Sequence, residues 1–215
     1  MLIGTEEFVA SMAHRPRTEM IAETRAKLLA AGRAAFGTVG YQAASMDDFT
    51  AGAGLTRGAL YHHFGDKKGL LQAVIAEIDA EMTLRLREVS ARASNPWQGF
   101  VDECSAYIEM ALEPEIQRIV HRDGPAVLGD PSRWPNQNGC IAALKSSLTE
   151  LRRLGYVRED IDPEAAARLI NGMSIHAAHW IAAADDPDAV SVQAVGAFKS
   201  LLEGLRAGQP VRRQA

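Results

Sequence analysis

The chain has 215 residues, 47% of them hydrophobic, and a formal net charge of −4. This length suits one large domain or two modest ones and is ample to bury a core. The apolar stretch at residues 177–184 is far too short to span a bilayer, and the acidic N-terminus lacks the cationic start and apolar segment of a signal peptide. We therefore expect a cytoplasmic protein without a membrane partner.

The composition favours an all-α fold, because Leu, Ala, Glu and Arg dominate over β-branched residues and no strand pattern is present. Charge is uneven along the chain. Residues 1–70 carry eight Lys/Arg against seven Asp/Glu, whereas residues 71–215 carry fifteen against twenty. Local rather than global charge decides contact with phosphate. Cys104 and Cys140 fit no metal-ligand spacing, and we expect both to be buried free thiols.

Residues 1–17 are expected to form a partly disordered N-terminal arm. His14-Arg15-Pro16-Arg17 brings two cations, which fit either a basic arm reaching a neighbouring DNA groove or a solvated tail. The first long helix is predicted from Glu19 to Gly37, because apolar residues recur there at three- and four-residue steps.

Two short helices follow, separated by a glycine. Ser45 is a predicted N-cap, Gly54 ends that helix, and Thr56 caps the next, which runs to about His63. A long helix before two short ones is typical of a helix-turn-helix unit, which we place at residues 18–66.

A fourth helix is predicted to begin after Asp66, its N-cap. Lys67 and Lys68 lie in its first turn, where the helix dipole disfavours cations. Their presence is explained if a phosphate binds at this helix end.

Residues 18–71 resemble the tetracycline-repressor (TetR) family. The resemblance is carried by residues 53–64, Ala-Gly-Leu-Thr-Arg-Gly-Ala-Leu-Tyr-His-His-Phe, with Asp66-Lys67 and Leu70-Leu71. It implies a helix-turn-helix domain joined by a long fourth helix to a helical effector-binding and dimerisation domain. It also implies a ligand-responsive transcriptional regulator, most often a repressor, that binds a palindromic double-stranded operator as a homodimer.

The resemblance assigns DNA contacts residue by residue. Arg57, Gly58, Ala59 and His62 occupy the base-facing positions, and Tyr61, His63 and Lys67 the phosphate-contacting ones. Arg57 has the reach for a bidentate contact with guanine, worth about 1–3 kcal/mol of discrimination. The hydroxyls of Ser45 and Thr56 can add phosphate bonds at helix N-termini. Asp47 stands where some relatives place a base-reading cation, so readout from that helix is not expected. The alternative is that His62 and His63 merely coat a helix and Tyr61 packs inward.

The rest of the chain is predicted to be helical, with a domain at 67–206 and a frayed tail at 207–215. The fourth helix should act as a connector. Asp-Pro pairs at Asp162 and Asp186 are strong helix starts. The expected elements are helices at 67–93, 97–112, 113–121, 136–154, 163–183 and 187–205, with a loop at 123–135.

The last two helices combine small and large apolar residues at helical spacing, which permits close approach of helices. They fit a four-helix bundle between two subunits or a pair within one chain, and the resemblance favours the dimer.

The middle helices are expected to hold a small-molecule effector. Such sites use adaptable apolar groups with a few polar tips, although most of these would also serve as core in any helical bundle. The candidates are Trp97, Tyr107, Met110, Trp134, Met173, His176 and Trp180.

A competing reading is a helical metal-dependent hydrolase that uses His121, Asp123, His176 and His179. Two histidines three residues apart on a helix can share a metal, but such pairs more often belong to a core or an interface. The sequence has no Gly-rich phosphate loop and no nucleophile elbow. We therefore expect no enzyme, no bound metal and no cofactor. A third class, a helical scaffold without operator binding, stays open.

Overall fold

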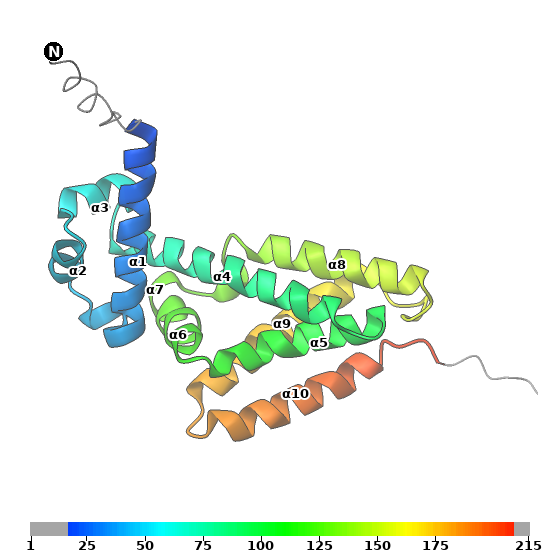
Figure 1. Cartoon of the computed structure of the whole chain (residues 1–215). Helices are drawn as coiled ribbons and strands as arrows, with labels where there is room; N and C mark the ends of the chain where they lie inside the picture. Colours follow the sequence, from blue (N-terminus) through cyan, green and yellow to red (C-terminus); the bar gives the residue numbers. More distant parts are fainter. Residues whose placement is uncertain (1–16, 209–215) are drawn as a thin grey trace, which may run out of the picture.

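A computed structural model of the chain describes residues 17–208 (Figure 1). Within this range the regular structure is helical, and the only extended pairing is an isolated antiparallel bridge between Val157 and Arg206. The all-α prediction is confirmed. Most of the predicted arm at 1–17 and most of the predicted tail at 207–215 lie outside the described residues. No helix in the described part is long and apolar enough to cross a membrane.

Three helices form an N-terminal unit at one end of a long connector (Figure 1). The helical elements, in chain order, are α1 (Arg17–Ala43), α2 (Met46–Gly52), α3 (Arg57–Phe64), α4 (Lys67–Ala91), α5 (Pro96–Glu109), η1 (Met110–Leu112), α6 (Pro114–Ile116), η2 (Gln117–Asp123), α7 (Gly124–Leu128), η3 (Pro131–Arg133), α8 (Gln137–Arg153), α9 (Pro163–Ala183) and α10 (Pro187–Glu203). We call α1–α3 the N-terminal unit and α5–α10 the C-terminal unit. Helices α5 and α7 pack on the rest of the connector, α4, while α9 and α10 pack on α5, and α8 packs on α9.

The predicted helix starts are confirmed by their caps. In each case a side-chain oxygen accepts a hydrogen bond from the backbone N–H three residues later, which satisfies a donor that the helix leaves unpaired. The residues that do this are Ser45, Thr56, Asp66, Asn95, Asp162 and Asp186.

Helix α1 is longer than the sequence predicts. It continues past Gly37 to Ala43, with a kink at Gly40, whose φ of 82° favours glycine. The kink frees the N–H of Tyr41, which donates to Asp123 Oδ2 at 2.7 Å. A contact across the fold therefore sustains the last turn, and no local pattern could have revealed it.

The predicted loop at 123–135 is wrong, because it contains the short helices α7 and η3. Trp134 orders the segment. Its indole N–H donates to the carbonyl of Gly129 at 3.2 Å, and its ring lies where a Cβ on Gly124 would clash. Just before it, η2 is a π-helical segment, a form that is rare and frequent at functional sites.

Two hydrophobic clusters divide the core. One joins the N-terminal unit to α4 and reaches η2 through Ile119, which is fully buried. The other lies among α5, α8, α9 and α10. Cys104 is buried in the second cluster as predicted, but Cys140 is exposed, so its predicted burial is wrong. The two clusters show why α4 acts as a connector: its buried residues, from Leu70 to Met82, belong to the first cluster while α5 packs along it.

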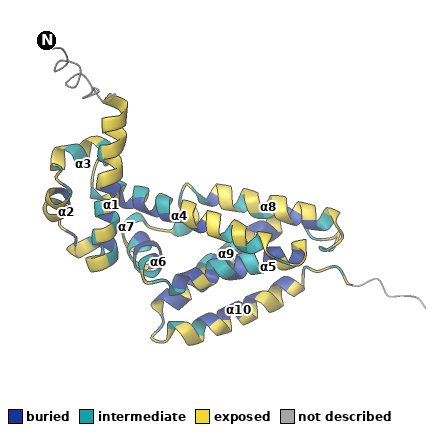
Figure 2. Cartoon of the chain, viewed as in Figure 1, coloured by how far each residue is buried: buried dark blue, intermediate teal, exposed yellow. Residues whose placement is uncertain are grey.

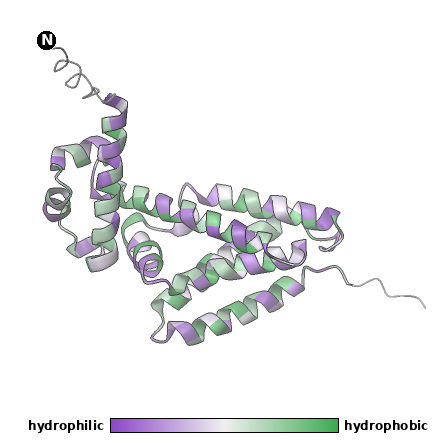
Figure 3. Ribbon diagram, in the orientation of Figure 1, coloured by the Kyte–Doolittle hydropathy of each residue, from purple (hydrophilic) through white to green (hydrophobic). Residues whose placement is uncertain are grey.

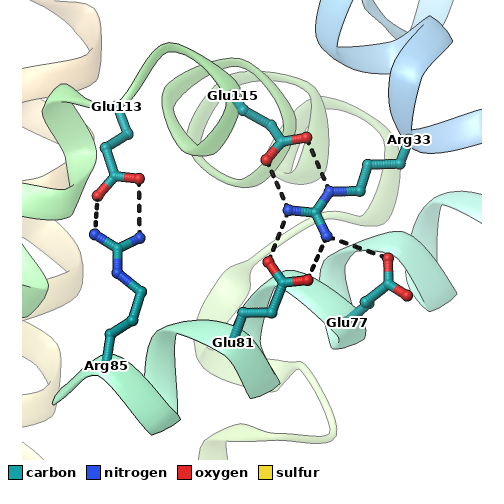
Figure 4. Close-up of polar contacts among 6 residues, drawn as sticks. All are labelled: Arg33, Glu77, Glu81, Arg85, Glu113 and Glu115. Atoms are coloured by element: carbon teal, nitrogen blue, oxygen red, sulfur yellow. Dashed lines mark hydrogen bonds and ion pairs between the residues drawn. The ribbon is translucent and has the colours of Figure 1, made fainter. Parts of the chain in front are cut away.

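A charged cluster holds α1, α4 and α6 together (Figure 4). The guanidinium of Arg33 donates to Glu115 at 2.9 and 2.8 Å, to Glu81 at 2.6 and 2.8 Å, and to Glu77 at 3.2 Å. The hydrogen bonds to Glu115, and then those to Glu81, raise the pKa of Arg33, so it stays charged. One cation thus fixes three carboxylates from two elements.

Candidate nucleic-acid interface and ligand pocket

Helices α2 and α3 form a helix-turn-helix whose turn depends on Gly54, with a φ of 68°. Leu60 is fully buried and Phe49 nearly so, and these two residues anchor the inner faces of α3 and α2. The outer face of α3 is exposed (Figure 2) and carries Arg57, Gly58, Tyr61 and His62. The alternative in which Tyr61 packs inward does not hold, because that side chain is 49% exposed.

Arg57 is held at this surface by a contact with α2. Its guanidinium forms an ion pair and a hydrogen bond with the carboxylate of Asp47 in α2. Both side chains are more than half exposed, so the pair contributes at most about 1 kcal/mol. It orients Arg57 across the two helices.

The other predicted contacts are less exposed. His63 is half-buried between His62 and Phe64, with ring centroids 5.3 and 6.2 Å away. Ala59 packs against the first cluster. Lys67 Nζ lies 4.5 Å from the centroid of the Tyr41 ring, and burial lowers the pKa of that lysine. The exposed hydroxyl residues Ser45 and Thr56 cap their helices at the same surface.

Gly69, which was not singled out from the sequence, sets the packing between α3 and α4. A Cβ at this position would lie 1.9 Å from the carbonyl oxygen of Phe64, so the end of α3 packs directly on the first turn of α4. Only glycine allows this approach. It fixes how α3 is presented, and the signal available in the sequence was a glycine inside a predicted helix.

The seven predicted ligand contacts do not converge on one site. Trp97 donates its indole N–H to Glu203 at 3.2 Å within the second cluster. Met110 and Trp134 belong to the first cluster, Tyr107 touches both, and Met173 packs on the second. Trp180 is 46% exposed on α9. His176 alone among the seven lines the pocket described next.

A pocket of about 440 Å³ opens between α8, α9 and η3. We call it the α8–α9 pocket. Apart from His176 its lining was not predicted as a ligand site, since it draws on three separate segments. The lining residues are Asp130, Pro131, Ser132, Ile141, Arg168, Asn171, Gly172, Ile175, His176 and His179.

Behind this pocket lies a buried histidine. His121 of η2 is only 7% exposed, its ring is 5.4 Å from that of His179 edge to face, and both of its ring nitrogens lack a hydrogen-bond partner. Burial, and then the neighbouring His179, lower the pKa of His121 to about 3, so it is neutral. An unpaired buried polar group costs about 1–3 kcal/mol, which makes this position unusual.

The hydrolase reading is not supported. His121 and His179 do meet, but Asp123 points away to the backbone of Tyr41. Among residues 17–208 no group of three or more His, Cys, Asp or Glu side chains could hold a metal ion.

A second polar group was also missed. Asp79 of α4 is half-buried beside Asn136, whose amide donates to it, and burial raises the pKa of Asp79 to about 6. The charge of Asp79 in turn helps to raise the pKa of Tyr107, after burial itself. A carboxyl thus lies in the middle of the connector helix.

Helices α9 and α10 carry several exposed apolar residues, and Figures 2 and 3 show exposed and hydrophobic positions along α10. Leu169 is 68% exposed, Val192 76% and Leu201 60%. Gly196 of α10, one turn after Val192, has open space beside it. We call these residues, with Trp180, the α9–α10 stripe. Several large apolar side chains exposed on two neighbouring helices are a candidate interaction surface.

A capped helix-turn-helix with an exposed basic helix, set on a separate helical unit, defines a DNA-binding transcription regulator rather than an enzyme. Comparison with known proteins supports that class. A family profile described as "Bacterial regulatory proteins, tetR family" matches residues 28–74, and "Tetracyclin repressor-like, C-terminal domain" matches residues 97–205. The chain therefore belongs to the TetR family of transcriptional regulators.

Individual transcriptional regulators are also similar to this chain. The regulator UidR of Escherichia coli K12 is 37% identical over 68% of this chain and 76% of its own length. The repressor KstR2 of Mycobacterium tuberculosis is 23% identical over 73% of this chain and 80% of its own length. The crystal structure of a TetR-family regulator from Pectobacterium atrosepticum is 52% identical, with a TM-score of 0.82, and the match covers 90% of this chain and 99% of that one.

Proposed function

We propose that this regulator is a repressor that binds a palindromic operator as a homodimer and is released by a small-molecule effector. The observation that carries the proposal is the outer face of α3, where Arg57, Tyr61 and His62 project from a short helix anchored by Leu60. Repression, rather than activation, is supported by the relative KstR2, which is named a repressor.

In this proposal α3 enters the major groove. Arg57 reads guanine, and Gly58, Ala59 and His62 face the bases, where the absence of large side chains at 58 and 59 lets the helix approach closely. Tyr61, His63 and Lys67 contact phosphates, together with the hydroxyls of Ser45 and Thr56. For Lys67 this requires the ammonium to leave the ring of Tyr41.

The dimer forms through the α9–α10 stripe. Large apolar side chains exposed on two adjacent helices, with Gly196 leaving room for close approach, match what a four-helix bundle between subunits needs. A two-fold axis then presents two copies of α3 to two half-sites.

The effector binds in the C-terminal unit. His176 lines its open pocket and is the first contact that we assign. The remaining predicted contacts, Trp97, Tyr107, Met110, Trp134, Met173 and Trp180, would act as surrounding core or interface. An effector changes operator affinity only if it binds the two conformations unequally.

Fluorescence anisotropy with labelled DNA from upstream of the gene tests the proposal. Specific binding should weaken with salt, and Arg57→Ala should weaken it roughly 10- to 100-fold, from the loss of about 1–3 kcal/mol. Arg92→Ala is the matched control, because Arg92 is an exposed cation at the far end of α4. Equal affinity for upstream and unrelated DNA would instead leave a helical scaffold without operator binding.

A further inference from the structure

We infer that the α8–α9 pocket binds a small organic acid, a carboxylate on a mainly apolar body, and that the His179–His121 contact transmits its occupancy to α1. The first half concerns binding alone. The second half rests on the proposed function, because it needs an operator to respond.

The seat for a carboxylate is set by the spacing of residues on α9. Arg168 lies one helical turn before Gly172 and His176 one turn after it, so all three share a face. Gly172 leaves open space where another residue would project a side chain. An anion over Gly172 thus has a guanidinium on one side and an imidazole on the other, a setting suited to charge-assisted hydrogen bonds.

The charges at the pocket favour an anion. Its one lining carboxylate, Asp130, already accepts a hydrogen bond from the N–H of Ser132 at 2.9 Å and lies 3.9 Å from Arg133. Arg168 bonds Glu164 on its own helix, which holds the guanidinium at the rim. The apolar part of the ligand would lie on Pro131, Ile141 and Ile175, which also line the pocket.

His121 contacts the α8–α9 pocket from the protein interior and can respond to a bound ligand. Its ring touches the ring of the pocket residue His179, and neither of its nitrogens is held by a hydrogen bond. A ligand that shifts His179 therefore removes a packing partner from His121 without any hydrogen bond to restrain the response.

The segment that carries His121 also holds the end of α1. In η2, Arg118 donates to the carbonyl of Thr38 at 2.6 Å and Asp123 accepts from the N–H of Tyr41 at 2.7 Å. On its other side Arg122 donates to the carbonyl of Ala182, at the end of α9, at 2.9 and 2.7 Å. One π-helical segment thus bridges the helix that lines the pocket and the helix that supports α3.

Binding is tested with two acids and their uncharged amides: benzoate against benzamide, and hexanoate against hexanamide. With ¹⁵N-labelled histidine rings, the His176 and His179 signals of the full chain should shift saturably with at least one acid. The affinity should be at least tenfold above that of the matched amide. His62 and His63 of α3 serve as internal references. No shift with either acid, or equal binding of the amide, overturns the inference.

Two variants place the acid. Gly172→Leu fills the seat and Arg168→Gln removes the charge, and each should weaken acid binding at least tenfold. Gly139→Leu is the matched control, because Gly139 is a helical glycine on α8 with open space around it and does not line the pocket. If Gly172→Leu and Gly139→Leu, both shown to be folded by circular dichroism, bind the acid alike, the site lies elsewhere.

Transmission is tested by operator affinity with and without the bound acid. The acid should lower that affinity at least threefold, and His121→Ala, which removes the ring that packs on His179, should abolish the response while still binding the acid. An undiminished response in His121→Ala overturns the route through His121. Failure to bind the operator at all would refute the proposed function, yet the ring signals would still report on the pocket.

Discussion

The face of α3 and the α8–α9 pocket differ in how far apart their parts lie in the sequence. The DNA-facing surface is assembled from residues 45–69, where caps, a turn glycine and a close glycine contact are neighbours along the chain. The pocket joins η3 to α8 and α9, and its buried histidine comes from η2. A local site can be recognised from spacing, whereas a site assembled by packing cannot.

The largest effect is expected from substitutions that disrupt the proposed dimer. Val192→Glu with Leu201→Glu should bury charge in the α9–α10 stripe, abolish dimerisation and reduce operator affinity roughly 10²-fold or more, because two half-sites no longer act together. Light scattering and anisotropy measure the two effects. Leu84→Glu, which alters a 61% exposed leucine on α4, is the control. A dimer that survives the double substitution would show that α9 and α10 pair only within the chain.

The close contact at Gly69, between the end of α3 and the first turn of α4, can be tested by substitution. Gly69→Ala places a methyl group against the carbonyl of Phe64, so the α3–α4 turn must open, at a cost of up to about 3 kcal/mol in unfolding free energy. Gly139→Ala makes the same change in open helical space and should stabilise the protein by about 0.5–1 kcal/mol. Urea unfolding of both variants gives the contrast. Equal effects would mean that the glycine contact is not a constraint.

The burial of His121 behind the α8–α9 pocket can be tested through the pH dependence of the unfolding free energy. Its folded pKa of about 3 lies below the usual value near 6.5, so the unfolded chain takes up this proton first and stability falls as pH drops below 6.5. His121→Leu removes that loss. The variant should therefore gain about 2 kcal/mol in unfolding free energy over the native protein between pH 7 and pH 5.

Asp79 acts with the opposite sign in part of this window, because its raised folded pKa of about 6 makes the folded state bind the proton first and gain stability as pH falls. It is present in both proteins and cancels in the difference. If His121→Leu tracks the native protein from pH 7 to pH 5, His121 is not buried as described.

The smallest expected effect on stability concerns the charged cluster around Arg33, which holds α1 against α4 and α6. Arg33→Ala leaves Glu77, Glu81 and Glu115 together without their cation and should cost about 1 kcal/mol, a modest value because the carboxylates are more than a third exposed.

Arg85→Ala breaks the neighbouring ion pair with Glu113 (Figure 4), whose two side chains are 49% and 42% exposed, and should cost less than about 0.5 kcal/mol. Chemical unfolding in low and high salt compares the two variants, and the Arg33 effect should shrink as salt screens it. An equal cost for both would mean that the threefold contact adds nothing to stability.

Much of the fold could be predicted because the residues that start its helices act on their near neighbours in the chain. Ser45, Thr56 and Asp66 act through the backbone three residues away, and the Asp-Pro starts of α9 and α10 do the same. The last turn of α1 and the helix α7 could not be predicted. The first depends on Asp123, some eighty residues away, and the second on the ring of Trp134.

The ligand site was harder to predict for the same reason. Large apolar residues such as Trp97 and Met110 fit either a pocket or a core, and packing placed these two in the core. The pocket instead uses Arg168 and Gly172, which carry no distinctive local signal. The sequence suggested that His176 and His179 could share a metal, with His121 and Asp123 completing the site. His121 and His179 do meet, but among residues 17–208 no group of three or more His, Cys, Asp or Glu side chains could hold a metal ion.

In the free protein the Asp47 carboxylate occupies the guanidinium of Arg57 and so competes with DNA for it. Any DNA group that takes Arg57 must first displace a carboxylate already in place. A lone phosphate is a poor replacement, since it meets the repulsion of Asp47, whereas guanine offers two acceptors and no charge. If Arg57 reads guanine as proposed, the carboxylate weakens binding to random sequence more than binding to the operator, so residence on non-target DNA becomes brief and the search along a genome correspondingly fast.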